Sequence, residues 1–463
     1  MPRHLLTALL AAACLSATSA LAAPSPPAAM AAYLQARERL GQFNGVVLAM
    51  KDGKVIFEHA YGWADVEQRV RNRPDTRFNV ASITKQFTAA AVLQLRDAGR
   101  LALSDSVCRF VEPCPDAWKP VTLRTLLNHT SGVPDYEEAL ELGSPDYTAF
   151  IGRPDNIERI LKEAAAKPLD FAPGSQWHYS NTGYILLARV VARASGETYE
   201  RYVEDHVLAP AGMGSSFIDD GLVAARSAEG YAAGGDIPLK ALVAGVRMED
   251  LPLVRRSPGD LHGEHGDAAL WTTAADLGRW VTALQGGRIV LPASLAEMED
   301  GGANGYGFGL EVGATGEHRR IRHTGQVNGF ISVIQWYPDD RVVLVAVTNY
   351  ENGRTSATMR DLAAILFGQP WDMPRAHALV EPDLASYQPL LGDYLYGDQT
   401  AKLKVEDGML LLEVPGQFTA GLLPEAGGGW YIPFLEGTAR IAPDGRGLIV
   451  HSRGVDKPLT RKP

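Results

Sequence analysis

Residues 81–97 read ASITKQFTAAAVLQLRD, and this stretch predicts a buried helix that begins at a reactive side chain. From residue 87 to 95 it is apolar nearly all round, which favours a helix at the centre of a domain. Ser82 would lie in its first turn, where the macrodipole and free amides favour developing negative charge. Lys85 would lie on the same face, because side chains at i and i+3 are neighbours on a helix.

Two further strings supply groups that a serine needs for attack on a carbonyl. Tyr179-Ser180-Asn181 offers a phenol and a carboxamide, and His323-Thr324-Gly325 leads into an apolar run. A nucleophilic serine requires a base, an orienting partner and an oxyanion hole. Each string alone is a weak signal, since Tyr350-Glu351-Asn352 repeats the second and His129-Thr130-Ser131-Gly132 resembles the third. Their order and wide spacing make the combination specific.

The combination resembles the serine β-lactamase and penicillin-binding-protein superfamily, whose motifs are Ser-x-x-Lys, Tyr-x-Asn and Lys-Thr-Gly. The chain is most similar to the branch of class C β-lactamases, D-Ala-D-Ala carboxypeptidases, D-aminopeptidases and related esterases. The resemblance covers about residues 30 to 368 and includes residues 122–132, 171–174, 271–277 and 306–309. It implies an α+β fold, an antiparallel sheet flanked by helices with an inserted all-α region. It also implies a serine hydrolase that forms an acyl-enzyme on a peptide, amide or ester and needs no cofactor.

The resemblance gives each motif residue a role. Ser82 would be the nucleophile, while Lys85 and Tyr179 would move its proton, and the sequence leaves open which of the two is the acylation base. Tyr179 would need a nearby cation for its phenol to ionise near neutral pH. The amides of Ser82 and Gln326 would form the oxyanion hole. Four further residues would bind the substrate: Asn181, His323, Thr324 and Gly325.

His323 stands where β-lactamases usually carry lysine, which bears a full charge for the carboxylate of a β-lactam. A neutral imidazole should demand such a carboxylate less, and should favour it more as pH falls and the ring gains charge. We therefore expect esters, amides or peptides as substrates, with a genuine β-lactamase as the alternative. A catalytically idle sensor of peptidoglycan fragments or β-lactams is the alternative from another class. Ala268-Ala269 also stand where relatives often have a glycine pair.

A second cluster, His262, His265 and Asp267, could suggest a metal site. These residues follow no standard ligand spacing. We therefore expect no metal there and a solvated loop, within a long loop or lid over residues 233–268.

Residues 1–22 have the pattern of a secretory signal, with Arg3 before an apolar core and a small-residue cleavage site. We expect an exported protein, periplasmic or secreted, with no transmembrane segment.

Cys108 and Cys114 are the cysteines that remain after removal of the signal. An oxidising compartment favours a small-loop disulfide between them over two free buried thiols. The net charge of −10, without a Lys/Arg stripe, argues against nucleic acid as a partner.

The chain divides into a β-lactamase-like domain over residues 30–368, a proline-rich linker over 369–385 and a small all-β domain over 386–463. A hairpin over residues 45–61 and strands over 329–337 and 341–349 should share one antiparallel sheet, with the helical region inserted between them. The last segment alternates short strands with glycine turns and resembles the lipocalin-like domains attached to some family members. It would stand as an independent domain or cap the active site.

Overall fold

The computed structural model describes residues 24–139, 145–219, 221, 226–234, 244–262 and 265–462. The segment interpreted as an export signal, and parts of the loop expected over residues 233–268, lie outside the described residues. Among those that are described, no helix has the length and apolar character needed to cross a bilayer.

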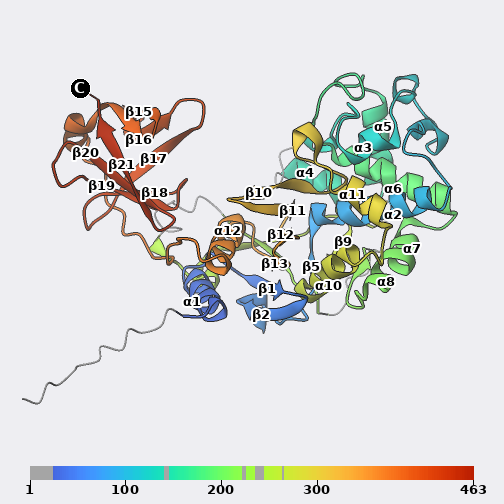
Figure 1. The fold of residues 1–463 in the computed structure, drawn as a ribbon, viewed down its shortest axis with the longest axis horizontal. Coiled ribbons are helices and arrows are strands. Elements are labelled where there is room, and N and C mark those ends of the chain that lie inside the picture. Colours follow the sequence, from blue (N-terminus) through green and yellow to red (C-terminus); the bar gives the residue numbers. More distant parts are fainter. Residues whose placement is uncertain are drawn as a thin grey trace, which may run out of the picture.

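A six-stranded sheet in the order β10-β11-β12-β13-β1-β2 forms the centre of the main domain (Figure 1). Its strands are β1 Gly45–Lys51, β2 Lys54–Tyr61, β10 Glu311–Thr315, β11 His318–Val327, β12 Phe330–Tyr337 and β13 Val342–Thr348. β1 pairs antiparallel with β13, from Gly45 opposite Thr348 to Lys51 opposite Val342. The expected sheet, shared by the first hairpin and the late strands, is therefore confirmed.

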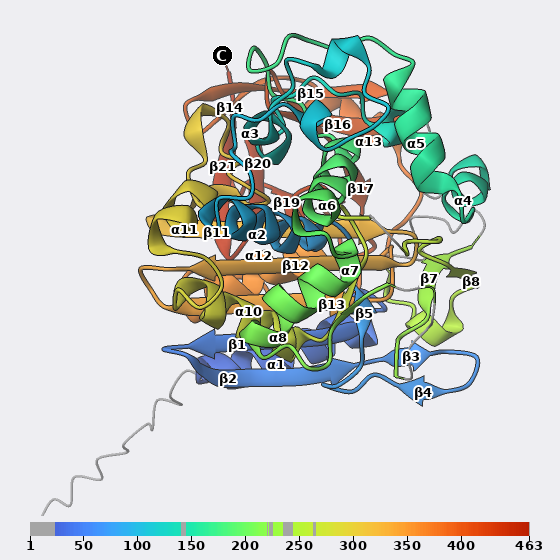
Figure 2. The same cartoon turned by 90° about the vertical axis from the view of Figure 1, so that its right-hand side faces the viewer.

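Both faces of this sheet are covered, which explains why β1 and β13 are apolar almost throughout. Val46 and Leu48 pack into the core that contains the central helix, whereas Val47 and Ala49 pack into a second core. Successive side chains of a strand point to opposite faces. Helix α10 (Ala274–Gln285) covers the first face, and α1 (Pro26–Arg39) and α12 (Thr355–Leu366) cover the second (Figures 1 and 2).

The helical region lies against the first face, with α2 (Thr84–Asp97) at its centre and α6 (Asn181–Ser195) packed against it. Every residue of α2 from Thr84 to Leu93 is buried, as the apolar sequence predicts. Other α-helices among the described residues of this domain are α3 Leu123–Leu127, α4 Pro145–Ile151, α5 Asn156–Ala165, α7 Tyr199–Val203, α8 Ala209–Ala211 and α11 Pro292–Met298. Short strands form three small separate sheets, β3-β4, β5-β9-β6 and β7-β8. Their bounds are β3 Trp63–Asp65, β4 Val70–Arg71, β5 Phe78–Asn79, β6 Phe217–Ile218, β7 Gly230–Ala233, β8 Leu253–Arg256 and β9 Leu270–Thr272.

After a short helix, α13 (Leu384–Tyr387), the C-terminal segment forms a closed eight-stranded antiparallel barrel. Its strands are β14 Gly392–Tyr396, β15 Gln399–Glu406, β16 Met409–Val414, β17 Phe418–Pro424, β18 Trp430–Ile432, β19 Gly437–Ile441, β20 Gly447–Ser452 and β21 Val455–Arg461. The interior is filled by apolar side chains such as Leu403, Leu412, Leu422 and Val450. The all-β fold expected for this segment is confirmed.

The barrel contacts the main domain on the face opposite to α2. Glu436 of the barrel lies 2.8 Å from Arg37 of α1, 3.2 Å from Arg360 of α12 and 3.6 Å from Arg354. The views in Figures 1 and 2 agree, since the barrel lies beyond α12 while α2 and α6 lie on the other side of the sheet. The barrel therefore does not cover the region around Ser82.

Candidate active site

Ser82 lies in a 3₁₀ turn, η1 (Ala81–Ile83), that leads directly into α2. Ala81 has a φ of 49°, a left-handed conformation that costs energy for a residue with a Cβ. The turn is held from both sides: the Ala81 amide donates to Asn79 Oδ1 at 2.8 Å, and the Val80 amide donates to the Leu270 carbonyl at 3.0 Å. The strained turn presents the half-buried Ser82 hydroxyl at the start of the central helix.

Lys85 is fully buried one turn further along. Its Nζ lies 3.0 Å from Ser82 Oγ, 2.7 Å from Asn181 Oδ1 and 3.1 Å from the backbone oxygen of Asp267. Burial lowers the pKa of Lys85 to about 8. A substantial fraction of the amine is therefore neutral in weakly alkaline solution, within hydrogen-bond distance of the serine.

The N-terminus of α6 places Tyr179 and Asn181 at the same point. Ser180 between them is the N-cap, and its hydroxyl accepts a hydrogen bond from the Gly183 amide at 3.3 Å. Burial raises the pKa of Tyr179 well above its usual value of 10, although a hydrogen bond with the Ser82 side chain opposes this. The Tyr179 phenol is thus a protonated hydrogen-bonding partner of Ser82.

His323, on β11, is buried and has both ring nitrogens bound within the protein. Nδ1 lies 2.6 Å from the Thr324 carbonyl oxygen and Nε2 lies 2.9 Å from the Tyr306 hydroxyl. A carbonyl oxygen can only accept, so Nδ1 carries the hydrogen and Nε2 accepts from Tyr306. Burial, followed by the positive charge of Lys85, lowers the pKa of His323 to about 4. The ring is therefore neutral at physiological pH.

Gly325 is needed where β11 passes the nucleophile turn. A Cβ at this position would lie 2.1 Å from the Val80 carbonyl oxygen and 3.2 Å from the Ala81 Cβ. Such distances require the backbone to move, so only glycine fits. The close approach is thus between β11 and the protein's own Ser82 turn.

The outer edge of β11 is open beside the serine. β10 pairs with β11 only up to Arg322, which is opposite Glu311. Beyond that point Thr324 is half-buried and Gln326 is exposed. An extended substrate backbone can pair with such an edge.

Two carboxylates that the sequence reasoning missed, Asp135 and Glu137, line the opposite side. The Asn181 Nδ2 group donates to Asp135 Oδ2 at 3.1 Å and to Glu137 Oε2 at 3.0 Å, so this amide bridges Lys85 to an acidic pair. Burial raises the pKa of Asp135 to about 6 and that of Glu137 to about 7. They follow shortly after Ser131-Gly132 in the sequence, but nothing in that string marks the loop as folding back onto α6.

Aromatic side chains surround Tyr179. The ring of His129 lies 4.3 Å from the ring of Tyr179 and 4.6 Å from that of Tyr306, between centroids. Trp177, which is 38% exposed, packs edge-on against His129 at the rim. His129 and Tyr306 occur in strings that carry the family resemblance, and that was the only sequence signal of their position.

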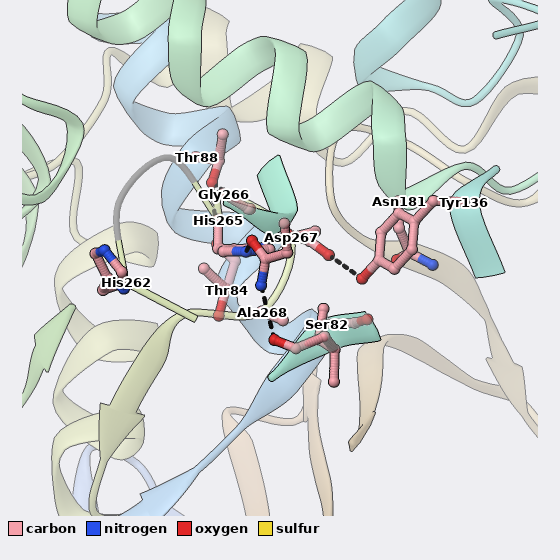
Figure 3. Close-up of polar contacts among 12 residues, drawn as sticks. Ser82, Thr84, Thr88, Tyr136, Asn181, His262, His265, Gly266, Asp267 and Ala268 are labelled. Carbon is pink, nitrogen blue, oxygen red and sulfur yellow. Dashed lines mark hydrogen bonds and ion pairs between the residues drawn. The ribbon is translucent and has the colours of Figure 1, made fainter. Parts of the chain in front are cut away.

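His265 and Asp267, which were expected on a solvated loop with His262, are instead buried, so that prediction is wrong for these two residues. His262 lies apart from them (Figure 3). His265 and Asp267 are 0% and 1% exposed and contact each other, with 3.3 Å between Nδ1 and Oδ1. Only His262 is partly exposed, and it pairs with Asp260. In the part of the chain that the structure describes, no three acidic, histidine or cysteine side chains are arranged to hold a metal ion.

The structure also joins Cys108 and Cys114 in a disulfide. The bridge closes a short loop at the end of a 3₁₀ turn, η2 (Val107–Arg109), and both cysteines pack against the main core.

Comparison with known proteins agrees with this geometry. The chain is 30% identical over 400 residues to penicillin-binding protein 4* of Bacillus subtilis, which covers 83% of this chain and 87% of that protein. It is 28% identical over 335 residues to a D-aminopeptidase of Brucella anthropi, covering 71% of this chain and 60% of that enzyme. The solved structure of an octameric penicillin-binding-protein homologue from Pyrococcus abyssi shares the fold, with a TM-score of 0.65, 22% identity and coverage of 93% and 99% of the two chains.

The description of the family that matches residues 30–369 is Beta-lactamase. That span contains the serine, the lysine, the tyrosine and the open strand edge described above. The chain belongs to the beta-lactamase family and is a serine hydrolase of the branch that includes penicillin-binding proteins and D-aminopeptidases.

Proposed function

We propose that this protein hydrolyses amides or peptides whose acyl part carries a free amino group, through an acyl-enzyme on Ser82. The observation that carries the proposal is the acidic pair Asp135 and Glu137, which is linked to Lys85 through Asn181 and is partly exposed at Glu137. Two carboxylates separated from Lys85 by the Asn181 side chain suit an ammonium group of the substrate.

The proton transfers follow from the hydrogen bonds. Neutral Lys85 takes the hydroxyl proton as Ser82 Oγ bonds to the substrate carbonyl carbon, giving a tetrahedral oxyanion and an ammonium. The amides of Ser82 and Gln326 are the proposed oxyanion donors. Tyr179 donates its proton to the leaving nitrogen as the C–N bond breaks, and Lys85 restores it. Water then attacks the ester, so the acid is released and Ser82 regains its proton.

The charge of the site disfavours an anionic substrate. The family's lysine is replaced by His323, which is neutral with a pKa of about 4. Lys85 is then the cation nearest the serine, facing the carboxylates of Asp135, Glu137 and Asp267. A β-lactam carboxylate would meet this acidic surrounding without a compensating lysine, whereas an ammonium would be attracted. The D-aminopeptidase name of one relative supports a substrate of D configuration.

The experiment compares D-alanine p-nitroanilide with its N-acetyl form. We expect kcat/KM to be roughly 10–100-fold higher for the free amine, the worth of one charge-assisted hydrogen bond. Glu137→Gln should remove most of that preference. Glu138→Gln is the matched control, because this exposed neighbour pairs with His178 at the surface and should leave the preference unchanged. Equal turnover of the two substrates by the unmodified protein would contradict the proposal.

The penicillin-binding names among the relatives favour a β-lactamase or a penicillin sensor as the second candidate. Nitrocefin decides between the candidates: fast turnover supports a β-lactamase, while a stable adduct on Ser82 without turnover of any amide supports a sensor. In all cases the adduct should be absent from Ser82→Ala.

We also infer export, which supports a periplasmic or secreted substrate. N-terminal sequencing of the native protein would test removal of residues 1–22.

A further inference from the structure

The Lys85 amine is oriented by two carbonyl oxygens, one of which belongs to the loop before β9. Nζ lies 2.7 Å from Asn181 Oδ1 and 3.1 Å from the Asp267 backbone oxygen. Each carbonyl can only accept, so each takes one N–H of the amine. The lone pair of the neutral amine is then left to face Ser82 Oγ at 3.0 Å. The backbone of Asp267 thus helps to aim the base at the nucleophile.

Side chains inside the domain hold this carbonyl in place (Figure 3). The Tyr136 hydroxyl donates to Asp267 Oδ2 at 3.0 Å, and His265 Nδ1 lies 3.3 Å from Oδ1. The carbonyl of Gly266 accepts from the Thr88 hydroxyl of α2 at 2.6 Å. The loop is therefore bound at Gly266 and at the Asp267 side chain, next to the carbonyl that contacts Lys85.

His265 is anchored in turn by Asn156. The Asn156 Nδ2 group donates to the carbonyls of Ile151 at 2.8 Å and Asp260 at 2.7 Å, so its Oδ1 is left to accept from His265 Nε2 at 2.9 Å. Nε2 therefore carries a hydrogen, while Nδ1 faces the Asp267 carboxylate. Burial raises the pKa of Asp267, but His265 and then Lys85 outweigh it and leave it below its usual value. The ring thus donates from Nε2 to Asn156 and turns Nδ1 toward the Asp267 carboxylate.

We propose that Asp267 and His265 are positioning residues for proton transfer: a buried pair that holds the carbonyl aiming Lys85 at Ser82 and sets the negative charge of Asp267 behind the amine. This inference rests on the proposed function only in taking Lys85 as the base. Neither side chain touches the reacting atoms.

The charges around Lys85 give the pair a measurable signature. Asp267 comes first among the carboxylates that raise the Lys85 pKa against burial, ahead of Glu137 and Asp135. Removing its charge should therefore lower the Lys85 pKa further, whereas removing His265 takes away the partner that stabilises the Asp267 carboxylate and should raise it. The other titratable groups that face Lys85 or Asp267 are neutral: His129, His323, Tyr136, Tyr179, Tyr184 and Tyr199.

The test measures the rate at which a fluorophosphonate probe labels Ser82 as a function of pH, which requires no knowledge of the substrate. The rate should rise with pH to a plateau, with its midpoint at the Lys85 pKa. In Asp267→Asn the midpoint should move to lower pH by roughly one unit, and in His265→Gln it should move to higher pH. His262→Gln, in the same loop but partly exposed and paired with Asp260, is the control and should keep the midpoint.

Opposite shifts in the two variants support the pair, because a purely structural role would lower the plateau and leave the midpoint in place. Unchanged midpoints, or shifts of the same sign, would overturn it. Circular dichroism shows whether each variant folds, and if Asp267→Asn does not, the upward shift in His265→Gln decides alone. Failure of the unmodified protein to label at Ser82 would instead overturn the proposed function, and this inference with it.

Discussion

His323 illustrates how far burial changes the chemistry of one side chain. An imidazole in water ionises near pH 6.5, and on that basis the sequence predicts growing affinity for carboxylate substrates as pH falls below 7. In the folded protein the ring is buried and both nitrogens are bound, so its pKa falls to about 4. Glu137, with a pKa of about 7, titrates in that range instead.

We therefore predict that the ratio of nitrocefin to p-nitrophenyl acetate hydrolysis rises as pH falls from 8 to 6, because Glu137 loses the negative charge that repels the nitrocefin carboxylate. The ratio of the two kcat/KM values cancels the shared ionisation of Lys85. The rise should disappear in Glu137→Gln and persist in His323→Gln. A rise that disappears only in the histidine variant would restore the assignment to His323.

Replacing His323 with lysine should restore a charge for β-lactam carboxylates. We expect His323→Lys to raise kcat/KM for nitrocefin by roughly 10-fold, the worth of one added charged hydrogen bond, with little change for the uncharged ester. Steady-state kinetics at pH 7.5 measure both. A parallel rise for both substrates would point to a general effect on Ser82 rather than carboxylate binding.

At the scale of elements, regular patterns were predictable and contacts between distant segments were not. The apolar run of α2 and the paired strands β12 and β13 were expected near their observed bounds. Helix α1 was not expected, because the sequence of residues 26–39 is merely rich in alanine and proline. Its role becomes clear only in the structure, where Tyr33 and Leu34 pack against the sheet.

At the site, the three motifs and their residues were recognisable. The acid pair and the left-handed Ala81 depend on loops folding back, which no local pattern reports.

Gly325→Ala should damage the contact between β11 and the nucleophile turn. The added Cβ would lie 2.1 Å from the Val80 carbonyl oxygen, so the strand or the turn must shift. We expect a loss of about 1–3 kcal/mol in unfolding free energy, as for overpacking, together with slower labelling of Ser82. Gly214→Ala is the control, since its Cβ would contact nothing within 4 Å. Unchanged stability and labelling in the Gly325 variant would show that the turn adapts freely.

The disulfide between Cys108 and Cys114 gives a second test at this scale. By the chain-entropy argument, a loop this short contributes about 2–2.5 kcal/mol. Cys108→Ser with Cys114→Ser should lower the unfolding free energy by that amount in urea titrations and leave Ser82 labelling unchanged. Alkylation of two thiols in unreduced, unfolded protein would show that the bridge does not form.

At the scale of the whole molecule, the linker and Glu436 fix the barrel to the main domain. Trp371 packs on Tyr33 of α1, while His377 stacks on Tyr431 of the barrel at 3.6 Å between ring centroids. Burial raises the pKa of Glu436, but Arg37 and then the other two guanidinium groups outweigh it and leave it below its usual value. The linker is thus bound to both parts, and we expect proteases to cut it slowly.

Glu436→Gln should destabilise the junction by about 1.5–3 kcal/mol, because the buried Arg37 loses one of its two carboxylate partners and keeps Asp361. Because the folded-state pKa of Glu436 lies below the unfolded value of 4.5, its stabilisation is complete above that value and is lost as pH falls through the folded pKa. The variant should therefore lose less stability than the unmodified protein does as pH falls below 4.5. Glu406→Gln, at an exposed barrel pair, is the control.

The position of β1 has a consequence for synthesis. This strand emerges early from the ribosome, yet it lies between β2 and β13, whose residues are made only at the end of the main domain. The edge of β1 that pairs with β13 stays unpaired until the whole helical region and then β13 have been translated. Strands left unpaired in this way are prone to aggregate. Nascent chains that stop before Val342 should therefore depend on chaperones, and those extended past Thr348 should not.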